Sequence, residues 1–184
     1  DLVVFYEANP KVFASSAALS AISERLPEIK KLGTTILWLM PINRLGSLKS
    51  VGSPYCVRDY KAVNPSYGTN EDLKSLVTKA HSMGMKVVMD WVANHTSWDN
   101  AWITEHPEWY TQENGVIISP KGTNWADVAD LNYDNKDMRA AMTDAMIYWI
   151  KEIGIDGYRC DAVDYVPVDY WTEAIAAIRK TKSD

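Results

Sequence analysis

Short apolar runs alternate four times with amphipathic segments along the chain. The runs at residues 2–6, 35–40, 86–91 and 155–160 have the length and the β-branched and aromatic content of strands buried on both faces. Residues 18–32, 71–83, 136–153 and 168–180 carry apolar side chains three and four positions apart, as amphipathic helices do. This alternation predicts an α/β fold with a parallel sheet and right-handed crossovers.

Small and polar residues mark the predicted helix ends. Gly33, Gly84 and Gly154 directly follow the first three helices, and glycine favours the left-handed conformation in which many helices end. Asn70 is expected to cap the second helix. Pro27 lies inside the first helix, where its missing amide hydrogen is expected to kink or shorten it.

One long segment interrupts the alternation. Residues 94–135 separate the third strand from its helix and contain scattered turn signals, together with Trp98, Trp102, Trp109, Tyr110 and Trp125. A loop of this length without structure of its own is uncommon in a compact domain. We therefore predict an inserted functional subdomain and divide the chain into residues 1–95, 96–135 and 136–184.

The composition is that of an ordinary globular protein, and it argues against a nucleic-acid partner and against a membrane span. The 184 residues are 47% apolar and 23% charged, which excludes intrinsic disorder. The net charge is −5 without a long basic run, so no nucleic-acid partner is expected. The apolar stretches are far too short to span a bilayer, so no membrane span is expected. Eight Trp and ten Tyr against two Phe favour contact with a partly apolar, partly hydroxylated ligand.

Neither the cysteines nor the glycines point to a cofactor. Cys56 and Cys160 lie far apart, without the spacing of a zinc knuckle or a CxxC motif, and we interpret them as small buried apolar residues. No glycine-rich loop follows a predicted strand, which disfavours a doubly wound domain that binds a phosphate ligand. We therefore expect no organic cofactor.

Polar residues follow the third and fourth strands, where ligands bind in parallel α/β folds. Asp90, Asn94 and His95 end the third strand, and Arg159 and Asp161 end the fourth. Side chains alternate along a strand, so Arg159 and Asp161 are expected to point the same way, and the cation would keep the carboxylate ionised. These residues suit glycosyl transfer, in which a carboxylate attacks an anomeric carbon. A metal-binding carboxylate cluster would use similar residues and stays open.

The same residues resemble the signature regions of glycoside hydrolase family 13, the α-amylase family. Residues 90–95, Asp-Trp-Val-Ala-Asn-His, resemble the first region, and residues 157–163, Gly-Tyr-Arg-Cys-Asp-Ala-Val, resemble the second. Residues 55–69 resemble the stretch before the family's second barrel helix, and residues 125–135 resemble the exit from its inserted domain B. Four motifs in the family's order cover most of the chain.

The resemblance implies a partial (β/α)8 TIM barrel, made of the first four βα units, with domain B inserted after the third strand. It implies a retaining hydrolase or transglycosylase that acts on starch, maltooligosaccharides or related α-glucans. By position, Asp161 matches the family nucleophile and Arg159 its supporting cation. His95 matches a residue that hydrogen-bonds the reacting sugar, Tyr55 one that stacks on it, and Asp90 a support at the floor of the site.

The resemblance also bears on metal binding. Asn94 and Asp130 match positions that bind calcium in many members, and both offer oxygen ligands that suit this ion. Calcium is therefore a possible cofactor. Asp164 and Tyr165 stand where many α-amylases carry Lys-His, which puts the usual amylase subsite and a backbone calcium ligand in doubt. This departure leans the specificity away from a standard endo-acting amylase.

The resemblance supplies no general acid among these residues. The family places that Glu at the end of the fifth barrel strand, whereas Asp184 here follows the fourth predicted helix. We therefore expect the N-terminal half of a catalytic domain, inactive without its C-terminal half. A non-catalytic relative that acts as a carbohydrate-binding or partner-docking scaffold is the alternative, although a scaffold has no need of Arg159, Asp161 and His95. We favour an extracellular or periplasmic location over a cytoplasmic one.

Overall fold

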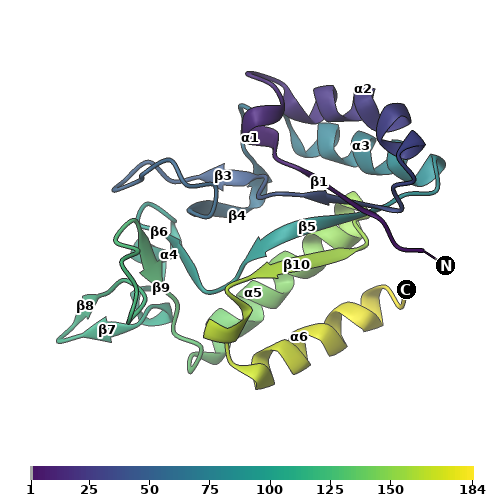
Figure 1. Cartoon of the computed structure of the whole chain (residues 1–184). Coiled ribbons are helices and arrows are strands. Elements are labelled where there is room, and N and C mark those ends of the chain that lie inside the picture. The colour runs from purple at the N-terminus through teal and green to yellow at the C-terminus, as the bar shows by residue number, and fades with distance from the viewer. Residues whose placement is uncertain (1) are drawn as a thin grey trace.

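A four-stranded parallel sheet forms the centre of the computed structural model, which describes residues 2–184. Its strands lie in the order β1 (Phe5–Ala8), β2 (Ile36–Leu39), β5 (Lys86–Val92) and β10 (Gly157–Asp161). All three pairings are parallel, so the carboxyl ends of the strands lie at the same edge (Figure 1). The predicted α/β class and parallel sheet are confirmed.

Two pairs of helices pack beside this sheet. In the view of Figure 1, α2 (Ala18–Lys31) and α3 (Asn70–Ser82) lie together above the strands, and α5 (Lys136–Tyr148) and α6 (Val168–Thr181) lie below them. The short helix α1 (Pro10–Phe13) follows β1. No helix within residues 2–184 is long and apolar enough to cross a membrane.

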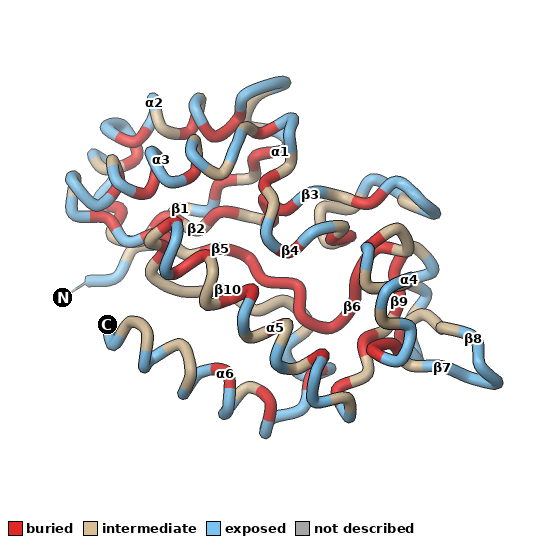
Figure 2. The backbone as a smooth tube through the Cα atoms, turned by 180° about the vertical axis from the view of Figure 1, so that it is seen from behind, coloured by how far each residue is buried: buried red, intermediate tan, exposed pale blue. Residues whose placement is uncertain are grey.

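The predicted apolar stripes become the buried helix faces. Leu19, Ile22 and Leu26 of α2 are fully buried, and the tube in Figure 2 alternates accordingly between buried and exposed positions along the helices. Most of β5 is buried in the same view, because this strand pairs with a neighbour on each side. The middle of the sheet thus belongs to the buried core.

Pro27 does not shorten α2, because the helix continues through it to Lys31. A proline at this position leaves the carbonyl of Ser23 without its helical amide donor. The Lys79 Nζ of α3 donates a hydrogen bond to that carbonyl at 2.7 Å. The neighbouring helix therefore supplies the donor that the proline lacks.

Three predicted boundaries differ from the structure. The first strand begins at Phe5 instead of residue 2, since the apolar side chain of Leu2 is 80% exposed. Thr69 caps α3 in a capping box with Asp72, so Asn70 is the first helical residue and not the cap. The predicted helix at residues 136–153 ends in a π-helical turn, η2 (Trp149–Ile153), which buries Trp149 completely.

The long interruption contains several small elements. They are β6 (His95–Ser97), α4 (Trp102–Glu105), the 3-10 turn η1 (Pro107–Trp109), β7 (Gln112–Glu113), β8 (Val116–Ile117) and β9 (Val128–Asp130). β6 pairs antiparallel with β9, and β7 pairs with β8 in a hairpin that extends from the body of the molecule (Figure 1). A third antiparallel pair, β3 (Asn43–Leu45) with β4 (Val57–Val63), lies before this segment and was not predicted. After β10 comes the 3-10 turn η3 (Val163–Tyr165).

Candidate active site

The carboxyl ends of β5 and β10 bring two acids and one arginine together. The strand register pairs Arg159 with Asp90. The Arg159 Nη1 donates to Asp90 Oδ1 at 3.0 Å and to Asp161 Oδ1 at 2.9 Å. Alternation along β10 thus places Arg159 and Asp161 on one side, as predicted. The guanidinium holds the two carboxylates of the site around one cation.

Asp90 is the buried member of this group. Its side chain is fully buried, and its Oδ2 accepts hydrogen bonds from Trp38 Nε1 at 3.1 Å and Tyr55 Oη at 3.4 Å. Burial raises the pKa of Asp90, while the hydrogen bond from Arg159 opposes this effect. The guanidinium of Arg159 also lies 5.3 Å from the Trp38 ring centre. Asp90 therefore holds Arg159 in place and has no face open to a ligand.

Asp161 is the acid that reaches a cavity. Its side chain is 24% exposed, and it lines a cavity of about 230 Å³. The other lining residues come from the β3–β4 connection and from the inserted segment: Ser53, Tyr55, His95, Trp125, Asp127 and Val128. A larger open groove of about 790 Å³ lies between α5 and α6, away from the strand ends. The smaller cavity is the better candidate because it combines an accessible strand-end carboxylate with aromatic walls.

His95 enters the cavity from β6 as a neutral imidazole. Burial lowers its pKa below the ordinary histidine value, although the charge of Asp161 opposes this effect. Its Nδ1 lies 3.1 Å from Asn94 Nδ2, and because an amide nitrogen can only donate, the imidazole proton belongs on Nε2. The Tyr60 hydroxyl donates to the backbone carbonyl of Val92 at 2.7 Å and lies 3.0 Å from the backbone carbonyl of His95. These contacts hold the start of β6, and the His95 ring lines the cavity.

Aromatic rings border the cavity on two sides. Tyr55 is half-buried, and burial together with the Asp90 charge raises its pKa to about 12, so the hydroxyl stays protonated at neutral pH. Trp125 packs edge-on against His95 at 5.5 Å between ring centres and lies 5.4 Å from Tyr165. Tyr165 is 49% exposed. Apolar ring faces beside hydroxyl and imidazole donors suit a sugar, which has both apolar and hydroxylated faces.

Five of the seven predicted site residues meet here: Tyr55, Asp90, His95, Arg159 and Asp161. Sequence reasoning did not select Trp38, Ser53 or Asp127, and treated Trp125 only as one aromatic of the insertion. Trp38 could have been found, since it lies at the carboxyl end of a predicted strand. The remaining three lie in loops, and no periodic pattern marks their side chains.

The two predicted metal ligands lie next to the cavity instead of in its lining. Asn94 contacts His95, and Asp130 Oδ2 accepts from the Thr111 hydroxyl at 2.6 Å. Burial raises the pKa of Asp130. The part of the chain that the structure describes holds no group of three or more His, Cys, Asp or Glu side chains suited to a metal ion. Two side chains therefore fit a calcium site only in part, since calcium takes six to eight oxygen ligands.

Comparison with known proteins identifies the family. The family described as "Alpha amylase, catalytic domain" matches residues 5–126 and 122–182. Alpha-amylase 3 of Dictyoglomus thermophilum is 31% identical over an alignment of 215 positions, which covers 98% of this chain and 42% of that protein. The chain thus spans about two fifths of the length of this relative.

Solved structures agree with this assignment. The crystal structure of an α-amylase from Lactobacillus plantarum is 40% identical with a TM-score of 0.89, covering 97% of this chain and 42% of that one. An α-amylase from Geobacillus thermoleovorans, in complex with acarbose, is 30% identical with a TM-score of 0.79, covering 98% and 44%. The chain therefore belongs to the α-amylase catalytic-domain family, glycoside hydrolase family 13.

Proposed function

We propose that this chain supplies the nucleophile and part of the sugar site of a retaining α-glucan hydrolase or transglycosylase. The observation that carries the proposal is the position of Asp161. Its carboxylate opens on the cavity, and Arg159 donates to one of its oxygens. The second oxygen is the atom available to attack an anomeric carbon, with the cation stabilising the ionised form.

The other cavity residues suit the binding of a glucosyl unit. Asp161 would form a covalent bond to the anomeric carbon as the leaving oxygen departs, and water would later release the sugar with its original configuration. His95 would donate from Nε2 to a sugar hydroxyl. Tyr55 and Trp125 would pack against apolar sugar faces. Starch, maltooligosaccharides and related α-glucosides fit this arrangement, and the acarbose bound by the Geobacillus relative supports the same substrate class.

We further infer that the sheet is the first half of a (β/α)8 barrel, with residues 96–135 as a domain B-like insertion. Within residues 2–184, β1 and β10 each have only one neighbouring strand, so both outer edges of the sheet are unpaired. Closure of a barrel would pair these edges. The general acid would then come from the second half, and the 184 residues alone would hydrolyse no ordinary α-glucan.

Calcium binding at Asn94 and Asp130 stays a prediction. A calcium ion there would take most of its oxygen ligands from the backbone and from water, and no step of the chemistry depends on it. A bound ion raises stability by mass action. Melting curves with and without chelator test the prediction, and identical melting temperatures would exclude a stabilising site.

The proposed function is tested with α-glucosyl fluoride and azide. Fluoride departs without protonation, so the first step needs no general acid, and azide is an anionic nucleophile that releases the sugar from Asp161 without a general base. The wild-type chain should release fluoride and form the α anomer of glucosyl azide first, as followed by proton NMR. Asp161→Asn should lower this rate by orders of magnitude, because an amide cannot attack the anomeric carbon. Asp134→Asn, an exposed aspartate outside the cavity, is the matched control. Initial release of the β anomer, or full activity of Asp161→Asn, would overturn the assignment.

A further inference from the structure

Two separate segments form opposite walls of the sugar cavity. The loop between β3 and β4 carries Ser53 and Tyr55, whereas the inserted segment carries His95, Trp125 and Asp127. Neither wall belongs to the central sheet, so its ladder hydrogen bonds do not fix the distance between them. Contacts between the two walls must therefore set the width of the cavity.

Asp99 makes two of these contacts through one carboxylate oxygen. The backbone N–H and the hydroxyl of Ser47, at the start of the β3–β4 loop, both donate to Asp99 Oδ2 at 3.0 Å. The Arg58 Nε of β4 lies 3.8 Å from the same oxygen. Burial raises the pKa of Asp99, but the neighbouring donors, chiefly the backbone N–H of Ser47 and the side chains of Ser97 and Ser47, outweigh this effect and hold that pKa below the ordinary value. The donors and the cation around Asp99 therefore favour its ionised form.

A glycine allows the two walls to approach so closely. A Cβ atom on Gly46 would lie 2.2 Å from Ser97 Cβ and 2.5 Å from Asp99 Oδ1, distances that no side chain tolerates. Gly46 does not have a positive φ, so the requirement is space and not backbone conformation. Any larger residue at this position must push the loop away from the inserted segment.

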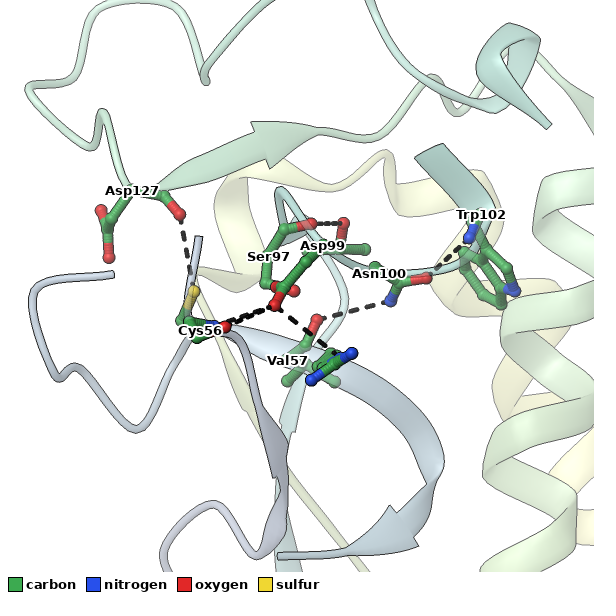
Figure 3. A network of polar contacts seen from close by, with 10 residues as sticks. Cys56, Val57, Ser97, Asp99, Asn100, Trp102 and Asp127 are labelled. Atoms are coloured by element: carbon green, nitrogen blue, oxygen red, sulfur yellow. Dashed lines mark hydrogen bonds and ion pairs between the residues drawn. The ribbon is translucent and has the colours of Figure 1, made fainter. Parts of the chain in front are cut away.

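Two weaker contacts hold the far end of the loop (Figure 3). The thiol of Cys56 donates to the Asp127 carbonyl at 3.5 Å, and the Asn100 Nδ2 donates to the Val57 carbonyl at 3.4 Å. Burial raises the pKa of the Cys56 thiol to about 11, which keeps it protonated as a donor. The loop is therefore attached to the inserted segment both before and after Ser53 and Tyr55.

We propose that Asp99 is a positioning residue, which fixes the width of the sugar cavity by fastening the β3–β4 loop to the inserted segment. This inference rests on the proposed function, because it names what sets the affinity of the same site. Asp99 does not line the cavity, so it acts on the sugar only through Tyr55 and Ser53. Its loss should let the loop move and weaken sugar binding without removing any group that touches the ligand.

Four variants test the proposal: Asp99→Ala, Asp99→Asn, Gly46→Ala and Asp156→Ala. Asp99→Ala removes the acceptor, Asp99→Asn keeps an acceptor oxygen for Ser47, and Gly46→Ala separates the walls without removing a polar group. Asp156→Ala is the matched control, because this buried carboxylate also accepts a backbone N–H and binds cations, but at the opposite end of the sheet. Melting curves first identify the folded variants.

The readouts are maltotriose affinity by calorimetry and amide hydrogen exchange of residues 47–56. Since misplacement by about 1 Å can cost up to about a hundredfold in a positioned site, we expect Asp99→Ala and Gly46→Ala to raise Kd roughly tenfold or more. Exchange of the loop amides should be faster in both variants than in the wild type. Asp99→Asn should have a Kd and an exchange rate between those of Asp99→Ala and the wild type. Asp156→Ala should have the Kd and the loop exchange rate of the wild type.

The outcomes separate the two proposals. Wild-type affinity and wild-type loop exchange in Asp99→Ala or in Gly46→Ala would overturn the positioning role while leaving the proposed function intact. Equal weakening in Asp156→Ala would also overturn it, because general destabilisation would then explain the loss. A wild-type chain that binds no maltotriose would instead contradict the proposed function, and the inference about affinity would fall with it.

Discussion

Asp156→Asn should destabilise the fold without touching the sugar cavity. Asp156 lies just before β10, with its side chain only 7% exposed. Its carboxylate accepts from Val87 N at 2.7 Å, contacts His81 Nε2 at 2.6 Å and accepts from Lys182 Nζ at 2.7 Å. One side chain therefore joins α3, β5 and the end of α6 at the amino-terminal edge of the sheet.

The expected magnitude follows from these contacts. A hydrogen bond to a charged group contributes about 1.5–3 kcal/mol, and the asparagine keeps an acceptor for Val87 but loses the attraction to two potential cations. His81 and Lys182 are 38% and 25% exposed, so water screens and partly replaces what they lose. We therefore expect the free energy of unfolding to fall by roughly 2–3 kcal/mol, which is below the sum of about 3–6 kcal/mol for two unscreened contacts.

Urea unfolding at several pH values measures this loss. The neighbouring donors hold the pKa of Asp156 below its ordinary value against the effect of burial, so at neutral pH the carboxylate is charged in both states and contributes fully. As the pH falls below about 4, the unfolded chain takes up a proton first, and the contribution disappears as the pH passes the lower folded pKa. The difference between wild type and variant should therefore be largest at pH 7 and shrink toward pH 3. A constant difference, or one below about 0.5 kcal/mol at pH 7, the range of an ordinary surface substitution, would refute the reasoning.

Two further predictions concern the cavity. Tyr55→Ala should weaken maltotriose binding by about 1 kcal/mol or more, because an aromatic face is lost. Tyr55→Phe keeps the ring and should retain most of the binding free energy. An unchanged Kd of Tyr55→Ala in calorimetry would mean that Tyr55 does not contact the sugar. Burial lowers the pKa of His95, so the unfolded state binds a proton first as the pH falls below about 6.5, and stability should decline there. His95→Gln should remove that part of the decline, and parallel melting curves of both proteins between pH 7.5 and 5 would contradict it.

The sheet and its helices could be predicted because their signals are local and repeated. Four strands and four amphipathic helices follow from periodicity alone, and the structure confirms their type and order. The expected burial of the first and fourth strands on both faces is wrong within residues 2–184, because β1 and β10 are the outer strands of the sheet and are largely exposed or only partly buried. The predictions fail where contacts with a distant segment determine the local structure. Pro27 does not break α2 because Lys79 of another helix satisfies the Ser23 carbonyl. The β3–β4 pair was not predicted because β3, residues 43–45, is too short to show the alternation of a strand.

The candidate site likewise contains residues placed by the strands, which were predictable, and residues placed by loops, which were not. Asp90, Arg159 and Asp161 were predictable as neighbours, because strand alternation and parallel pairing fix where their side chains go. Ser53 and Asp127 were not, since each lies in a loop whose position depends on contacts with a distant segment. Tyr55 was predicted only from a resemblance to known motifs, whereas the position of His95 followed from the end of the third strand and the resemblance supplied its role. Periodicity therefore finds the half of the site that the sheet builds.

On the proposed function, the loop-built half of the site would let one strand framework accommodate different sugars. The Asp90–Arg159–Asp161 group is held by the sheet, so changes in the loops leave the attacking carboxylate in place. The cavity width instead depends on the contact of Ser47 with Asp99 and on the absence of a side chain at Gly46. A substitution at either point would alter which ligands fit without altering the attacking group. Specificity in this chain should therefore change through loop contacts more readily than through the strand ends.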